Sequence, residues 1–254
     1  MSYEISAQIL YKTPFDPTAL MYHGYASYFL AISENDTEQA QFLFNEAINS
    51  LRLAILQSSE KVVPQLEFML GKAYFYKDVL SSSNYYSDLA VKYLLLAKSK
   101  GYTAVELPEI LGLSYSALGM TNESISAFTE ALNIRETDIL LLSIAEQYMA
   151  SNQYSAAEQY LYRISKNCKD EKIILKTHYL LGKIYINKEN YTEAENELLK
   201  VIEKNENFAD AYYELGVIYE KQGDIAKARA EWRKSLRIEY NHIEAQKKLA
   251  DYKQ

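Results

Sequence analysis

Three histidines and one cysteine are the side chains of this 254-residue chain best suited to acid–base catalysis, nucleophilic attack or metal binding. His23, His178 and His242 stand far apart in the sequence, and Cys168 is the only thiol. The chain contains no His-Glu-x-x-His, no Cys-x-x-Cys, no Gly-x-x-x-x-Gly-Lys phosphate loop and no Gly-x-Ser-x-Gly nucleophile motif. The sequence therefore predicts a protein that is not an enzyme and holds neither a cofactor nor a metal.

The composition favours long helices and excludes several classes of protein. Eight glycines and four prolines are few for this length, which argues against a turn-rich β fold. The net charge of −7 argues against a nucleic-acid binder, because such proteins display a basic face. No run of about 20 apolar residues predicts membrane insertion. A cytoplasmic location is expected, although a chain that had lost an upstream signal or anchor would have the same sequence.

Small residues recur at the centre of several predicted helices, and the last two occurrences align most closely. Leu181-Gly182-x-x-Tyr185 is followed 34 residues later by Leu215-Gly216-x-x-Tyr219. In a helix these three positions lie on one face, where the glycine lets a second helix approach. Equivalent small residues stand at Gly71, Gly112 and Ala145. The wider spacings between them place loop insertions near 81–84 and 167–172.

This pattern resembles the tetratricopeptide-repeat (TPR) family, whose 34-residue unit is a helix-turn-helix. The resemblance implies an all-α fold, a right-handed superhelical solenoid of antiparallel helix pairs with about five to six units forming a single domain over 1–254. Units are expected at 64–104, 105–137, 138–174, 175–208 and 209–241, with a divergent helix pair at 15–60 and a capping helix at 242–253. The family's usual Trp early in the first helix and its closing Pro are absent from these units.

Turn residues agree with this division. Gly119, Asn152 and Gly223 follow predicted first helices, where a left-handed cap favours Gly or Asn. Asn190 and Asp224 precede predicted second helices and are expected to cap them. A turn and N-cap at residues 35–37 opens a long helix predicted to run to about residue 58.

The resemblance places a partner-binding groove on the concave side of the solenoid, lined by first-helix side chains. The predicted groove residues are Phe68, Lys72, Phe75, Lys176, Tyr179, Lys183, Asp210, Tyr213 and Glu220. Aromatic and aliphatic anchors with scattered charges suit recognition of a peptide. The carboxylate clamp by which some members of the family hold chaperone tails is not matched, since Glu109 and Glu146 occupy clamp positions and its Asn is missing.

These observations favour a non-enzymatic scaffold or adaptor that binds a protein or peptide partner in the concave groove. The alternative is a structural component of a bacterial envelope or motility (flagellar) complex that uses its ends or convex face, and self-association is possible. Residues 1–60 carry seven acids and two bases. That imbalance serves either solubility or the steering of a basic partner toward the N-terminal half.

Overall fold

The computed structural model describes residues 2–81, 85–164 and 168–252. Within these ranges it contains fourteen α-helices and no strand, which confirms the predicted all-α solenoid. The chain divides into two compact units, residues 1–136 and 137–254. The predicted loop insertions near 81–84 and 167–172 lie partly outside the described residues, and the repeat boundaries stay a prediction.

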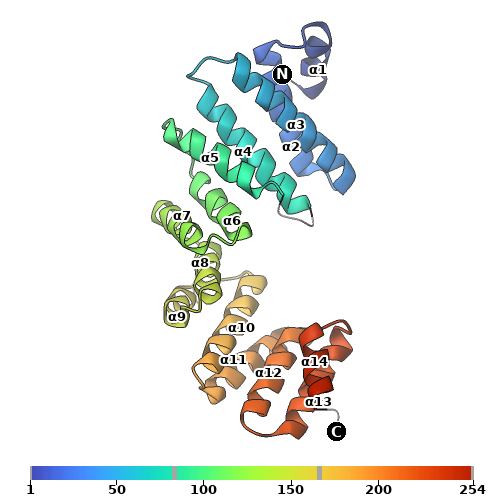
Figure 1. Ribbon diagram of the computed structural model, residues 1–254, viewed down its shortest axis with the longest axis vertical. Coiled ribbons are helices and arrows are strands. Elements are labelled where there is room, and N and C mark those ends of the chain that lie inside the picture. Colours follow the sequence, from blue (N-terminus) through green and yellow to red (C-terminus); the bar gives the residue numbers. More distant parts are fainter. Residues whose placement is uncertain (1, 82–84, 165–167, 253–254) are drawn as a thin grey trace. The chain divides into compact units, whose positions relative to one another are not determined.

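The first unit consists of antiparallel helix pairs that follow a short N-terminal helix (Figure 1). Its helices are α1 (Tyr3–Lys12), α2 (Pro17–Ser33), α3 (Thr37–Gln57), α4 (Val63–Leu80), α5 (Ser87–Ser99), α6 (Leu107–Ala117) and α7 (Thr121–Ile134). Helix α2 packs on α3, α4 on α5, and α6 on α7. The second helix of each pair also packs on the first helix of the next pair within the unit.

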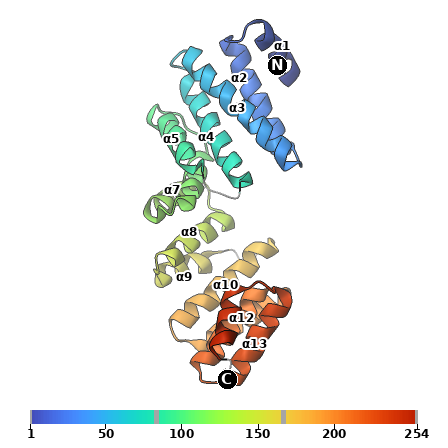
Figure 2. The ribbon, with the colours of Figure 1, turned by 45° about the vertical axis from the view of Figure 1, so that its right-hand side comes forward.

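The second unit repeats this arrangement and ends on a single helix (Figure 2). Its helices are α8 (Asp138–Ala150), α9 (Tyr154–Arg163), α10 (Glu171–Asn187), α11 (Tyr191–Lys204), α12 (Ala209–Lys221), α13 (Ile225–Ile238) and α14 (Ile243–Asp251). The terminal helix α14 packs on α13 and buries Ala245 against Trp232 and Ala228. No helix of the described residues is long and apolar enough to cross a membrane.

Small residues at the centre of the first helices make the close helix contacts possible. A Cβ atom on Gly182 of α10 would lie 2.9 Å from Cδ2 of Leu198 in α11. Gly24 of α2 is in the same situation, since a Cβ atom there would lie 2.7 Å from Cγ of Leu51 in α3. The pair at 15–60 therefore packs through the same kind of small residue, although it lacks the Leu-Gly-x-x-Tyr sequence.

The predicted turn residues adopt the conformations that their types favour. Gly119, Asn152 and Gly223 have φ angles of 70°, 58° and 84°, which confirms the left-handed caps. The side chains of Asn190 and Asp224 accept hydrogen bonds from the backbone N–H groups three residues later, so both are N-caps. Asp36 caps α3 in the same way.

Helix α1 was not predicted from the sequence. Its side chains contact His23, one of the three histidines. The side chain of Ser2 caps its N-terminus by accepting a hydrogen bond from the backbone N–H of Ile5. Ser6 Oγ lies 3.1 Å from Nδ1 of the buried His23 in α2, and the Tyr3 ring stacks on the same imidazole at 4.7 Å. His23 thus joins α1 to α2.

Candidate protein-interaction surface

The side chains best suited to catalysis form contacts between helices. His178 Nδ1 lies 2.6 Å from Glu197 Oε2, joining α10 to α11. Burial opposes ionisation of Glu197, but hydrogen bonds from His178 and Lys200 outweigh the effect of burial and lower the pKa of Glu197.

The remaining histidine and the cysteine also have structural surroundings. The His242 ring accepts a hydrogen bond from the backbone N–H of Ala245 at the start of α14. Burial raises the pKa of the Cys168 thiol. The described residues contain no group of three or more His, Cys, Asp or Glu side chains arranged for a metal.

We call the faces of α2, α4, α6, α8, α10, α12 and α14 that carry or continue the predicted groove residues the inner faces. In the second unit, charged groups on these faces connect neighbouring helices. The contacts are Lys176 to Glu146 at 3.2 Å, Lys183 to Glu214 at 3.8 Å, Asp210 to His242 at 3.1 Å and Glu220 to Lys248 at 2.5 Å. Each predicted groove charge in this unit is therefore already paired with an acid, a base or a histidine of the next inner face.

The two predicted groove tyrosines of the second unit are half-buried by packing. The Tyr179 ring of α10 lies 5.3 Å from the Phe208 ring, and the Tyr213 ring of α12 lies 5.0 Å from the His242 ring. Burial, with a smaller contribution from Glu214, raises the pKa of both phenols, that of Tyr213 to about 12. Both rings thus contribute to packing as well as to the surface.

The first unit places its three predicted groove residues on α4 in different environments. Phe68 is only 3% exposed and packs 5.0 Å from the Tyr102 ring. Lys72 Nζ lies 5.4 Å from the Phe68 ring and 2.5 Å from Glu106 Oε1. Phe75 is half-buried beside Tyr76 at 5.1 Å. The lysine thus occupies a site made of aromatic rings and one carboxylate, where cations are attracted to ring faces.

Three half-buried tyrosines of the inner faces, and Tyr102 in the loop before α6, have hydroxyl groups that form no hydrogen bond with any residue the structure describes. We call them the inner-face tyrosines: Tyr76, Tyr102, Tyr179 and Tyr213. Two tyrosines on the opposite sides of the first helices do have partners, since the hydroxyl of Tyr219 donates to Glu195 at 2.5 Å and that of Tyr185 contacts the hydroxyl of Tyr162. Tyr74 and Tyr115, at the same repeat position as Tyr185 and Tyr219, form no such bond with a described residue, so unpaired hydroxyls are not confined to the inner faces.

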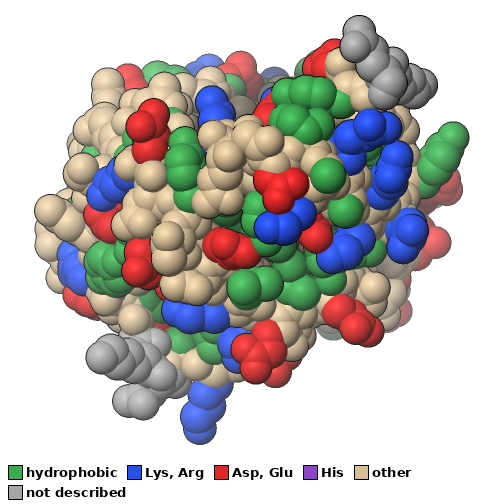
Figure 3. All heavy atoms as spheres, turned by 90° about the horizontal axis from the view of Figure 1, so that it is seen from below, with side chains coloured by type: hydrophobic (Ala, Val, Ile, Leu, Met, Phe, Trp, Pro, Cys, Tyr) green, Lys and Arg blue, Asp and Glu red, His purple; other side chains and the backbone are tan. Residues whose placement is uncertain are grey.

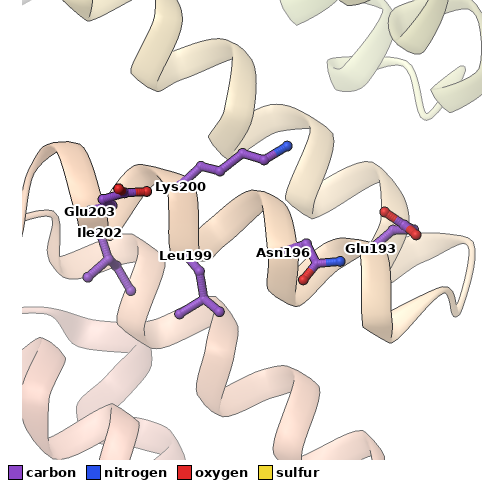
Figure 4. Close-up of a pocket in the computed structure, with 6 residues that line it drawn as sticks. All are labelled: Glu193, Asn196, Leu199, Lys200, Ile202 and Glu203. Atoms are coloured by element: carbon purple, nitrogen blue, oxygen red, sulfur yellow. The ribbon is translucent and has the colours of Figure 1, made fainter.

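Two shallow hollows lie elsewhere, and the sequence analysis did not predict them. One, of about 550 Å³, follows the exposed side of α11 (Figure 4). Its lining residues are Glu193, Asn196, Leu199, Lys200, Ile202 and Glu203. The other, of about 630 Å³, lies between α1 and α2 beside Phe29, which is 62% exposed. In the sequence, the only feature that pointed to these hollows was an apolar residue in a helix, such as Leu199 or Phe29, that the structure shows to be exposed.

Comparison with solved structures supports the fold assignment. The APC/C hetero-tetramer Cut9-Hcn1 aligns with 99% of this chain at 16% identity and a TM-score of 0.63, and the chain spans 45% of that chain's length. MamA from Desulfovibrio magneticus RS-1 aligns with 70% of this chain and 97% of its own at 16% identity and a TM-score of 0.58. The apo quorum sensor NprR from B. thuringiensis aligns with 91% and 68% at 19% identity and a TM-score of 0.69.

The helix pairs and these likenesses define a TPR-type helical-repeat protein. The sequence family described as the tetratricopeptide repeat protein 21 C-terminal ARM domain matches residues 108–251, more than half of the chain. The chain therefore belongs to that family. No curated protein sequence matches it significantly.

Proposed function

We propose that the chain is a non-enzymatic protein-interaction scaffold that holds a segment of a partner protein against its inner faces. The observation that carries this proposal is the set of inner-face tyrosines with unpaired hydroxyls. A tyrosine whose ring is anchored by packing and whose hydroxyl is free offers apolar contact and a hydrogen bond at little entropic cost. Such side chains are enriched where proteins bind one another.

Because the charges of the inner faces are largely paired, these faces favour a partner that binds mainly through apolar contacts and hydrogen bonds. Lys176, Lys183 and Glu220 are neutralised by their neighbours within the second unit, so a partner must compete with an existing ion pair to use them. In the first unit, Glu106 and Glu109 lie close enough to Tyr76 to raise its pKa further, after burial. Glu106 is already paired with Lys72, so Glu109 is the carboxylate that favours a basic residue of the partner segment there.

The test uses substitutions that remove hydroxyl groups and keep the rings. A Tyr76→Phe, Tyr102→Phe, Tyr213→Phe triple variant should capture less partner from a lysate of the source organism than the wild type does. The matched control replaces three exposed tyrosines outside the inner faces: Tyr11, Tyr85 and Tyr240, each to Phe. Loss in the first variant with retention in the control supports the proposal. Equal capture by both variants contradicts it.

A second candidate function, structural assembly through an end of the chain, rests on the hollow beside α1. Phe29 and Leu30 are exposed there on α2, next to Tyr3. Exposed apolar groups beside a concavity favour burial against another protein. A Phe29→Glu, Leu30→Glu variant should then lose a complex that the triple tyrosine variant retains. If it retains the complex, the end contact is excluded.

A further inference from the structure

The outward side of α13 is basic along its whole length. Its outward positions are Ala226, Lys227, Arg229, Ala230, Arg233, Lys234 and Arg237, and the one acidic residue of the helix, Glu231, lies half-buried at the edge of this side. The opposite side buries Ala228, Trp232 and Ser235. We call this outward side the α13 basic face. Seen from below, Lys and Arg side chains gather toward the right-hand part of the view (Figure 3).

The repeat does not impose this arrangement. In α11, the second helix of the preceding pair, the positions 34 residues earlier carry a mixture of types. Glu195, Leu199 and Glu203 stand where α13 has its three arginines, and Glu193 stands where α13 has Lys227. Because the two helices pack by the same pattern, packing alone does not require arginine on α13. Three of the six arginines of the chain are nevertheless placed there.

The lysines and the arginines of the α13 basic face differ in their partners. Lys227 Nζ lies 3.1 Å from Asp224 Oδ2, and Lys234 Nζ lies 2.8 Å from Glu231 Oε1. No arginine of this face forms an ion pair or hydrogen bond with any residue that the structure describes. Arg229 Nε is also buried and has no hydrogen-bond partner there. An external acceptor cannot reach this enclosed Nε, so a partner's carboxylate would bind the terminal guanidinium nitrogens of these arginines.

The arginines also have a regular spacing. Arg229, Arg233 and Arg237 are four residues apart, so they lie one helical turn, about 6 Å, from one another along one side of α13. The small side chains of Ala226 and Ala230 lie beside this row and leave room for another backbone to approach. Guanidinium groups bind carboxylates in a paired, planar geometry. A row of carboxylates one turn apart on a second helix matches this spacing.

We propose that the α13 basic face is a docking surface for an acidic helical segment of another protein, with Arg229, Arg233 and Arg237 receiving its carboxylates. This surface is separate from the inner faces, so the chain would bind two partner segments at once. The second site would hold a partner by charge, and the inner faces would hold theirs mainly by aromatic contacts.

An acidic protein segment fits this face better than a nucleic acid or a membrane does. The basic face is only one helix wide. Helix α11 of the same unit displays Glu193, Glu195 and Glu203 on its corresponding side, and the chain as a whole has a net charge of −7. A duplex or an anionic bilayer covers more than one helix and would meet these carboxylates. A single acidic helix contacts α13 alone.

The test uses a synthetic probe and a matched pair of charge reversals. The probe is a peptide of about 20 residues made of Ala-Ala-Ala-Glu repeats, long enough to populate a helix, and its counterpart has Gln in place of Glu. Arg233→Glu with Arg237→Glu changes two exposed residues. The control, Arg52→Glu with Lys61→Glu, makes the same change in net charge at exposed positions of the first unit.

The wild type and the control should bind the Glu peptide equally, with an affinity that falls as salt is added. The Arg233, Arg237 variant should bind at least tenfold more weakly, and none should bind the Gln peptide. Equal binding by the two variants, or no preference of the wild type for Glu over Gln, would overturn the proposal. Stronger binding of duplex DNA or of anionic vesicles than of the Glu peptide would also overturn the proposal. So would a sedimentation experiment in which the wild type self-associates and the Arg233→Glu, Arg237→Glu variant does not, because the face would then bind a second copy of the chain.

Discussion

The indole ring of Trp232 in α13 lies directly against the Cα atom of Gly216 in α12, which leaves no space for a side chain on that glycine. A Cβ atom built there would lie 2.9 Å from Cε2 of Trp232 and closer still to Cδ1 and Nε1. Trp232 is fully buried among Ala228, Ala245 and the Tyr252 ring. A large rigid ring packed on a bare backbone is thus the central contact of the last helix pair.

Replacing Gly216 with Ala should destabilise the protein by about 1–3 kcal/mol, because the rigid indole cannot move aside without disturbing α14. The loss should appear despite the better helix propensity of Ala, which is worth about 1 kcal/mol. Gly182→Ala provides the comparison, since its neighbour Leu198 can change rotamer. Urea unfolding of both variants measures the difference. A Gly216→Ala variant as stable as Gly182→Ala would show that the indole contact is looser than described.

Asp78→Ala should lower the free energy of unfolding by about 1–3 kcal/mol, because two hydrogen bonds that join α4 to α5 would be lost. The buried carboxylate of Asp78 accepts the backbone N–H of Tyr86 at 2.9 Å and the hydroxyl of Ser87. Asp88→Ala in the first turn of α5 is the control, since that side chain is exposed. Thermal unfolding separates the two. Equal effects would mean that the α4–α5 link is energetically unimportant.

Glu214→Gln should raise the melting temperature at pH 7 and have no effect near pH 4. Burial, assisted by Asp210, raises the pKa of Glu214 despite Lys183 and His242 nearby. The folded state therefore holds this proton more tightly than the unfolded chain, whose glutamate pKa is about 4.3. Ionisation of the buried carboxyl costs stability as the pH rises above that value, and the cost is absent below it. A stability difference that does not change between pH 4 and pH 7 would contradict the shift.

Tyr179→Ala should destabilise the second unit by about 2 kcal/mol, less than a fully buried aromatic because the ring is only half-buried. The ring packs on Phe208 and contacts two hydrophobic clusters. Tyr179→Phe keeps this packing and should change stability by less than about 0.5 kcal/mol. Denaturant unfolding tests both. An unaffected Tyr179→Ala variant would show that the residue acts only at the surface.

The spacing of small and aromatic residues was sufficient to predict the helix pairs, because Gly182 and Gly216 lie where the two helices of a pair pack too closely for a larger side chain. The turn residues Gly119, Asn152 and Gly223 were equally readable, since their types match a left-handed backbone. The sequence did not reveal α1, whose short stripe carries no repeat signature. It also did not reveal that Gly24 packs like the other small residues, because His23 stands where the family pattern has leucine.

The candidate surface could be predicted only in outline. The resemblance placed Lys183, Asp210 and Glu220 on one side of their helices, but their pairing with Glu214, His242 and Lys248 depends on the neighbouring helix. The same holds for tyrosine hydroxyls, since Tyr213 and Tyr219 look alike in the sequence but only Tyr219 donates a hydrogen bond to a described residue. Interactions between residues about 30 positions apart require the packed structure.

The most direct test of the central proposal is site-specific photo-crosslinking with the captured partner. Leu113 of α6 follows Gly112 as the predicted groove residues Lys72 and Lys183 follow Gly71 and Gly182, so it belongs to the inner face of α6. A photoreactive amino acid at Leu113, which is 37% exposed, is compared with one at Leu199 of α11, which is 48% exposed on the outward side. Binding at the inner faces predicts a partner adduct from position 113 and none from position 199. An adduct from position 199 alone would contradict the account and place the partner on the outward side of the second helices.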